Sequence, residues 1–151
     1  MQLKIVGFTK KQQSELTEAA HLFANLLMDP RTVRRLNIDI EHTPNNEVQG
    51  ECVDEDGNRN PRWFTISIRG SKGDDDIIQT LAHEMVHVKQ YAKNELKYGM
   101  LVPTRGGFKS TSKWMGEIWK PKGKEDHYYD APWEIEAYGR EVGLYAKWLN
   151  R

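Results

Sequence analysis

The chain of 151 residues contains a single cysteine, Cys52. A single thiol cannot form a disulfide within the chain. The absence of a second cysteine also excludes a zinc ribbon or any other zinc site built on paired thiolates. A chain without a disulfide framework is typical of a reducing compartment, so we expect a cytoplasmic protein. The apolar stretch at residues 5–8 is too short for the hydrophobic segment of a secretory signal.

Long hydrophobic runs are also absent. No stretch approaches the roughly 18 consecutive apolar residues that a membrane span needs, so we expect no membrane contact. The formal charges balance, with 22 Lys and Arg against 22 Asp and Glu, which excludes a global field that would attract nucleic acid. Five Trp and six Tyr argue against a disordered chain, and the length fits a single domain over residues 1–151.

Apolar periodicity predicts an α+β fold. The first helix is expected from Thr9 to Asp29, with a capping box of Thr9 and Gln12 at its start and Pro30 after its end. A period of two then predicts three strands with one buried face each, at residues 36–41, 48–52 and 64–68. Short connections between these strands, one with an Asp-Gly-Asn turn, favour a largely antiparallel meander.

Two further helices are predicted. The first, over residues 74–93, carries an apolar stripe of Ile78, Leu81, Met85, Val88 and Ala92. A long irregular stretch follows over residues 97–130, with a short hairpin around residues 109–120. Pro132 then opens a final helix to Leu149, whose expected inward face consists of Ile135, Tyr138, Val142, Tyr145 and Leu149.

Residues 83–87, His-Glu-Met-Val-His, form an HExxH pattern on the second predicted helix, over residues 74–93. Two histidines four positions apart lie about one turn apart on one face of a helix, so both imidazoles can bind one metal ion. Glu84 is offset from His83 by about 100° around the helix, which places it beside the metal as a general base. The alternative is that His83 and His87 are solvated side chains on an outer helical face, opposite the apolar stripe.

The order of these elements, with an HExxH helix followed by a helix that carries a third ligand, resembles the zincin metallopeptidases. Gln90 and Lys93 stand where metzincins have Gly and His, which excludes that branch. Residues 132–138, Pro-Trp-Glu-Ile-Glu-Ala-Tyr, look like the Glu-x-x-Ala or Glu-x-Glu-Ala helix of glutamate-ligand zincins. The whole chain is similar to small SprT-like or ImmA-like peptidases, including those of phages. This resemblance implies hydrolysis of protein or peptide substrates with one zinc ion.

Glu134 and Glu136 both compete to be the third ligand. Relative to the expected inward face of the final helix, Glu134 lies about 60° to one side and Glu136 about 140° away, on the solvent side. We therefore predict a zinc site of His83, His87 and Glu134, with Glu84 as the catalytic base. The alternative role of Glu134 is to stabilise the first helical turn beside Pro132.

Other site residues follow only from the resemblance to zincins. The Asp that often follows the glutamate ligand by four residues is replaced by Tyr138, so a partner for the histidines must come from elsewhere; the candidates are Asp126, Asp130 and Glu141. A Tyr or His near the metal stabilises the oxyanion in similar zincins. Tyr128 and Tyr129, which follow His127, are candidates for this role, and ordinary packing of both tyrosines is the alternative.

Residues 97–130 contain seven basic and four acidic side chains, interleaved with Phe108, Trp114 and Trp119. This stretch could cover the substrate, bind nucleic acid, or pack its aromatic rings on the rest of the domain. Because the net charge of the chain is balanced, we expect only weak binding of nucleic acid. The strand at residues 63–69 could pair with an extended substrate. Two other functions stay open: a DNA- or protein-binding accessory protein with a structural metal, and a zinc amidase for a non-protein amide. The sequence predicts no oligomeric state.

Overall fold

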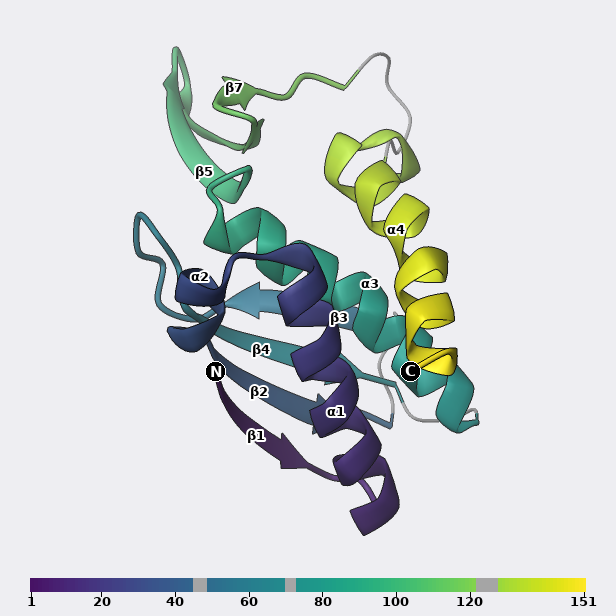
Figure 1. Ribbon diagram of the computed structural model, residues 1–151. Coiled ribbons are helices and arrows are strands. Elements are labelled where there is room, and N and C mark those ends of the chain that lie inside the picture. Colours follow the sequence, from purple (N-terminus) through teal and green to yellow (C-terminus); the bar gives the residue numbers. More distant parts are fainter. Residues whose placement is uncertain (45–48, 70–72, 122–127) are drawn as a thin grey trace.

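Across residues 1–44, 49–69, 73–121 and 128–151, which the computed structural model describes, the chain forms four α-helices and two β-sheets (Figure 1). The α+β class is therefore confirmed. The elements are β1 (Gln2–Val6), α1 (Lys10–Leu27), α2 (Pro30–Arg34), β2 (Asn37–His42), β3 (Gly50–Asp54), β4 (Trp63–Ile68), α3 (Asp74–Ala92), β5 (Leu96–Thr104), β6 (Gly107–Trp114), β7 (Glu117–Ile118), a 3-10 turn (Tyr128–Asp130) and α4 (Pro132–Leu149).

The larger sheet has the strand order β1-β2-β4-β3. β1 is parallel to β2 and β2 is parallel to β4, whereas β3 is antiparallel to β4. The predicted three-stranded antiparallel meander is therefore wrong: among the described strands β1 is an additional member, and two of the three pairings are parallel. β1 and β2 are parallel because α1 and α2 form a crossover between them. β2 and β4 are parallel because the intervening strand β3 runs in the opposite direction and pairs on the other side of β4.

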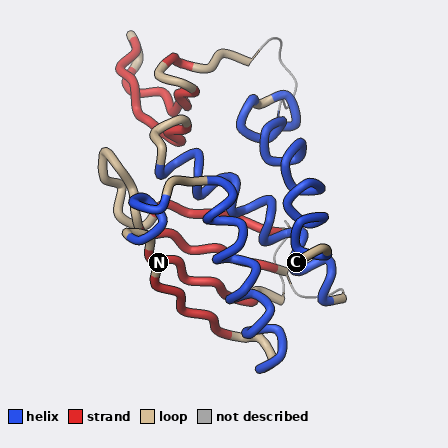
Figure 2. Tube along the Cα trace, in the orientation of Figure 1, coloured by secondary structure: helices blue, strands red, loops and turns tan. Residues whose placement is uncertain are grey.

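One face of this sheet carries the core. Ile38, Ile40, Phe64 and Ile66 are at most 1% exposed, and they alternate along their strands with more accessible residues. The helices α1 and α3, blue in Figure 2, cover this face. Since the opposite face is mostly polar, the sheet buries only one side, as the period of two predicts.

Both ends of α1 have local causes. The capping box is confirmed, because Thr9 Oγ1 accepts from the Gln12 amide and Gln12 Oε1 accepts from the Thr9 amide. The helix ends at Leu27, before Asp29, because Asp29 caps α2 instead: its Oδ1 accepts from the amides of Arg31 and Thr32.

The α3 helix is enclosed on both sides. Its apolar stripe packs on α1 and the sheet, and the opposite side packs on α4. His83, Glu84, His87 and Gln90 are therefore at most 8% exposed. This burial contradicts the alternative in which the two histidines are solvated on an outer face. No helix in the described ranges is long and apolar enough to cross a membrane.

The stretch after α3 is more regular than expected. β5, β6 and β7 form an antiparallel sheet that projects from the body (Figure 1). The predicted hairpin corresponds to β6 and β7, which turn at Met115 and Gly116, both with positive φ. Trp114 and Trp119 pack around Trp133 of α4, which confirms packing on the body for these two rings, whereas Phe108 is 74% exposed. Lys122 and Lys124 lie outside the described residues.

The α4 helix packs with a different face from the predicted one. Ile135, Val142 and Leu149 are each about 60% exposed, at 59%, 62% and 59%. The buried residues are instead Trp133, Glu134, Ala137, Leu144 and Trp148. The helix is apolar on two faces, and the face with the large Trp133 and Trp148 rings is the one that reaches the core.

Candidate metal centre

Three buried side chains from α3 and α4 converge on one point. The Nε2 atoms of His83 and His87 are 3.2 Å apart. Glu134 Oε2 lies 3.4 Å from His83 Nε2, and Glu134 Oε1 lies 3.5 Å from His87 Nε2. The exposed fractions of the three residues are 8%, 7% and 5%. This His-His-Glu group can hold a metal ion.

The polar atoms of this group fit a cation. Glu134 Oε2 is buried and has no hydrogen-bond partner among the described residues. His83 Nδ1 lies 2.8 Å from Glu141 Oε2, and an ionised carboxylate can only accept, so His83 carries its proton on Nδ1. In the neutral ring, Nε2 then presents a lone pair to the Glu134 carboxylate, and two acceptors that face each other are satisfied by a metal ion. Without a metal a proton takes that place, because burial alone would lower the pKa of His83 and of His87 but the Glu134 carboxylate raises it.

The spacing and the donor types suit a divalent transition-metal ion, of which zinc is one example. Zinc–nitrogen bonds of about 2.0–2.1 Å in tetrahedral geometry separate two imidazole nitrogens by about 3.3 Å. The observed 3.2 Å between the two Nε2 atoms matches this separation. Two imidazoles and one carboxylate are also the protein ligands of many catalytic zinc sites, in which a fourth position is left for water or substrate.

Glu84 lies beside the three ligand residues and is not one of them. Its carboxyl group is 4% exposed, and this burial raises its pKa to about 7. The carboxylate lies over β3 at Gly50, where an added methyl group would be 2.5 Å from Glu84 Oε1. The missing side chain of Gly50 therefore makes the space that Glu84 occupies.

Glu134 has the opposite pKa shift. Burial alone would raise its pKa, but its contacts with the His83 and His87 rings lower the pKa to about 2. The site thus contains one carboxyl group that is ionised at neutral pH and one that is close to its titration point.

The structure brings one of the two predicted tyrosines towards the site. Tyr128 begins the 3-10 turn before α4, and burial together with the Glu134 carboxylate raises its pKa. Tyr129 is 72% exposed, and its ring contacts those of Tyr128 and Tyr138. The roles of both tyrosines in oxyanion stabilisation stay predictions. His127 lies outside the described residues.

Several neighbours of the histidines have polar or aromatic contacts that the sequence motif does not specify. Glu141 is the partner of His83 among the three candidates, whereas Asp126 lies outside the described residues. Gln79 Nε2 donates to Glu141 Oε1 at 3.2 Å, and the Tyr138 ring lies 4.5 Å from the His83 ring.

Gln90 Oε1 lies 2.8 Å from His87 Nδ1. Gln79 lies four residues before His83, and Gln90 lies three residues after His87. Helical spacing alone could therefore have identified both glutamines as neighbours of the histidines.

Glu136 is not on the solvent side, contrary to the sequence prediction. Its carboxylate accepts from Gln90 Nε2 and from Lys89 Nζ, at 3.0 and 2.6 Å. The prediction was wrong because it used the exposed face of α4 as the reference for inward residues. Glu134 nevertheless points inward, since the true buried face includes Trp133 and Ala137.

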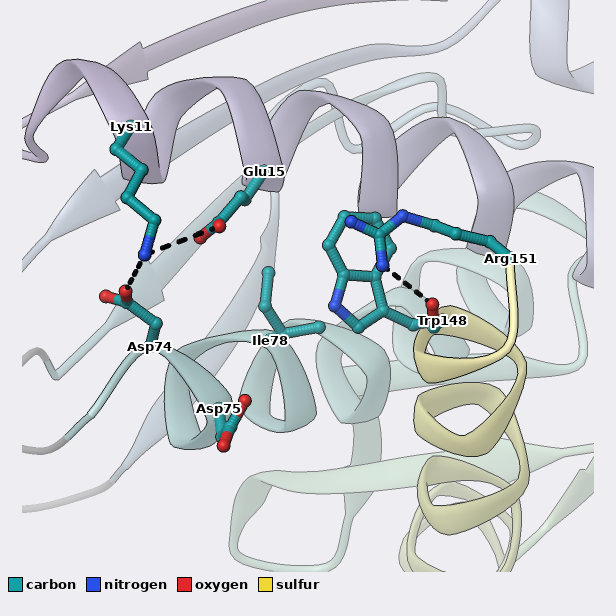
Figure 3. Close-up of a pocket in the computed structure, with 7 residues that line it drawn as sticks. All are labelled: Lys11, Glu15, Asp74, Asp75, Ile78, Trp148 and Arg151. Atoms are coloured by element: carbon teal, nitrogen blue, oxygen red, sulfur yellow. Dashed lines mark hydrogen bonds and ion pairs between the residues drawn. The ribbon is translucent and has the colours of Figure 1, made fainter.

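A separate hollow of about 430 Å³ lies where α1 meets the start of α3 and the end of α4 (Figure 3). Three of its charged groups pair with one another: Lys11 Nζ is 2.9 Å from Asp74 Oδ2 and 3.6 Å from Glu15 Oε1. The Arg151 guanidinium covers the Trp148 ring. The hollow contains none of the residues of the metal centre.

No model of a known protein family matches this sequence. No curated protein and no solved structure matches it either. The resemblance to zincins therefore depends on residues 83–87 and 132–138 alone, and the function is inferred from the site itself.

Proposed function

We propose that this protein is a zinc-dependent hydrolase that cleaves peptide bonds. One observation carries the proposal: the buried Glu84, with its pKa of about 7, lies beside the His83–His87–Glu134 group. A structural zinc site has four protein ligands and needs no neighbouring base. Three ligands with an adjacent carboxyl base are the arrangement of a hydrolytic site.

A zinc ion bound by His83, His87 and Glu134 would lower the pKa of a coordinated water to about 7 and polarise the scissile carbonyl. Glu84 accepts the proton of the attacking water and gives it to the nitrogen of the leaving amine as the C–N bond breaks. Without a metal, burial raises the pKa of Glu84 to about 7. The charge of a bound zinc ion would lower this pKa and favour the ionised carboxylate, which is the form that accepts a proton. The Tyr128 hydroxyl is our candidate donor to the carbonyl oxygen.

The sheet edge beside the site is the proposed binding surface for an extended substrate. The predicted pairing of substrate with the strand at residues 63–69 is wrong, because β2 and β4 pair on one side of that strand and β3 and β4 on the other. Among the described strands β3 is one of the two edges of the sheet, and it is the edge that packs alongside α3. Strand addition to β3 would carry a peptide past Gly50 and Glu84.

The test is digestion of an unfolded protein such as casein by the zinc-loaded enzyme. We expect hydrolysis that stops on chelation and returns with zinc. Glu84→Gln should keep stoichiometric zinc and the fold, and lower the rate by about 10²–10⁴-fold, since it removes only the general base. A Glu84→Gln variant that loses zinc as His83→Ala does, or that keeps the wild-type rate, contradicts the proposed role of Glu84.

A further inference from the structure

Gln90 connects the second histidine of the site to α4. Its side chain is fully buried, with 0% exposure, and its Oε1 lies 2.8 Å from His87 Nδ1. Its Nε2 donates to the backbone carbonyl of Trp133 at 2.9 Å and to Glu136 Oε2 at 3.0 Å. One amide group thus makes three hydrogen bonds, two of them to α4.

These contacts fix the orientation of the Gln90 amide. A backbone carbonyl and a carboxylate only accept hydrogen bonds, so the NH2 group must face Trp133 and Glu136. The oxygen must then face His87, and His87 must carry its proton on Nδ1 to donate to it. In the neutral ring the lone pair of His87 is therefore on Nε2, the atom that faces His83 and Glu134.

A buried ion pair holds Glu136 in place. Lys89 is 5% exposed, and its Nζ lies 2.6 Å from Glu136 Oε1 and 2.6 Å from Glu95 Oε2. Arg140 Nε adds a contact of 2.9 Å to Glu136 Oε1. Both cationic groups contact Oε1, so the other oxygen, Oε2, is left to accept the hydrogen bond from Gln90.

We infer that Gln90 is a positioning residue of the metal centre: the Lys89–Glu136 ion pair acts through Gln90 to hold His87 as the Nδ1–H tautomer, with Nε2 ready to bind a metal. His83 reaches the same state through a different group, the Glu141 carboxylate. The metal-binding part of this inference depends on the proposed function. The tautomer does not, because the contacts that set it lie within the chain.

The first measurement is the tautomer of each histidine in the metal-free protein, by NMR of ¹⁵N-labelled imidazoles at a pH at which the rings are neutral. The chain has five histidines, and removal of each in turn assigns the signals. We expect His87 with a protonated Nδ1 and a bare Nε2. A proton on Nε2 of His87 overturns the inference, and this result needs no variant to fold.

The second measurement compares Gln90→Leu with a matched control, Gln79→Leu. Gln90→Leu should give a mixture of His87 tautomers and lower zinc affinity by about 10–100-fold in competition with a chromophoric chelator, the usual effect of losing a group that orients a ligand. Gln79→Leu removes a partner of Glu141 and should leave the His87 signals unchanged. A general loss of structure would change the imidazole signals of both His83 and His87 in both variants.

Two outcomes separate this inference from the proposed function. Gln90→Leu with zinc affinity within twofold of wild type and an unchanged His87 tautomer overturns the role of Gln90. Wild-type protein that binds no zinc, while His87 carries its proton on Nδ1, rejects the proposed function and keeps the tautomer assignment.

Discussion

Two buried carboxyl groups in one site have pKa values that are displaced in opposite directions. Burial raises that of Glu84 to about 7, and the two imidazole rings lower that of Glu134 to about 2 despite its burial. Opposed shifts of this kind separate the group that exchanges a proton from the group that stays charged. At the scale of single residues, this contrast supports the proposed roles of Glu84 as base and Glu134 as ligand.

Replacement of Glu134 tests this assignment. Glu134→Ala should lower zinc affinity by more than about 100-fold, because groups that only orient a ligand already contribute 10–100-fold. Glu136→Gln keeps an oxygen acceptor for Gln90 and should change zinc affinity far less. Chelator competition measures both constants, and a larger loss in Glu136→Gln than in Glu134→Ala would reverse the roles of the two residues.

The sequence was sufficient for part of this site. His83, Glu84 and His87 follow from local spacing on one helix, so no tertiary information is needed to place them together. Glu141 was one of three candidates, and Gln90 was not considered as a neighbour of His87. The Glu141 contact depends on how α4 is rotated against α3, and the apolar pattern does not indicate this rotation because α4 is apolar on two faces. Gln90 lies on α3 together with His87, so helical spacing alone could have predicted their contact.

At the scale of elements, the contact between β3 and α3 depends on one missing side chain. Gly50 lies in β3 under Glu84 and Thr80, and an added methyl group would be 2.5 Å from Glu84 Oε1 and 2.6 Å from Thr80 Cγ2. The φ angle of Gly50 is outside the left-handed region, so alanine is compatible with its backbone. The glycine is therefore needed for close approach and not for its flexibility.

Gly50→Ala should consequently move the Glu84 carboxylate and leave the three metal ligands in place. We expect the hydrolysis rate to fall by about 100-fold, the effect of a displacement of about 1 Å, with zinc content unchanged. Gly143→Ala on α4 is the control: a methyl group there meets no atom within 4 Å, and it should raise stability by about 0.5–1 kcal/mol. Full activity in Gly50→Ala would show that Glu84 has room to move without effect.

The rotation of α4 about its own axis can be tested by comparing the free energies of unfolding of two variants. Leu144 is 7% exposed and Val142 is 62% exposed, although the heptad-like spacing of the sequence favours Val142 as the inward residue. Leu144→Ala should lower the free energy of unfolding by about 2–4 kcal/mol, and Val142→Ala should change it by no more than about 0.5 kcal/mol. Urea denaturation of both variants decides between the two faces, and a greater loss in Val142→Ala would support the other rotation.

At the scale of the whole molecule, the chain topology was the part that the sequence predicted least well. The strands predicted at residues 36–41 and 64–68 are present as β2 and β4, but β1 was overlooked because Gln2–Val6 is short and precedes the first clear periodicity. Without β1, the helices before β2 do not look like a crossover. Parallel pairing depends on such long-range connections, whereas caps and strand periods are local.

The metal centre joins distant parts of this fold. His83 and His87 lie on α3, Glu134 lies on α4, and polar contacts from Glu141 and Gln90 connect the same two helices. A metal ion that binds only the folded protein stabilises it by about 2.7 kcal/mol at a free concentration 100 times its dissociation constant. Zinc should therefore raise the melting temperature of the wild type, and it should have no such effect on His83→Ala.

The most direct test of the account is the zinc content of the purified, folded protein, measured by elemental analysis beside His83→Ala. The structure leads us to expect one zinc ion per wild-type chain, removed by chelation and restored by added zinc, and none in the variant. A wild-type protein that binds no zinc, or a His83→Ala variant that keeps it, would contradict the assignment of His83, His87 and Glu134 as a metal centre.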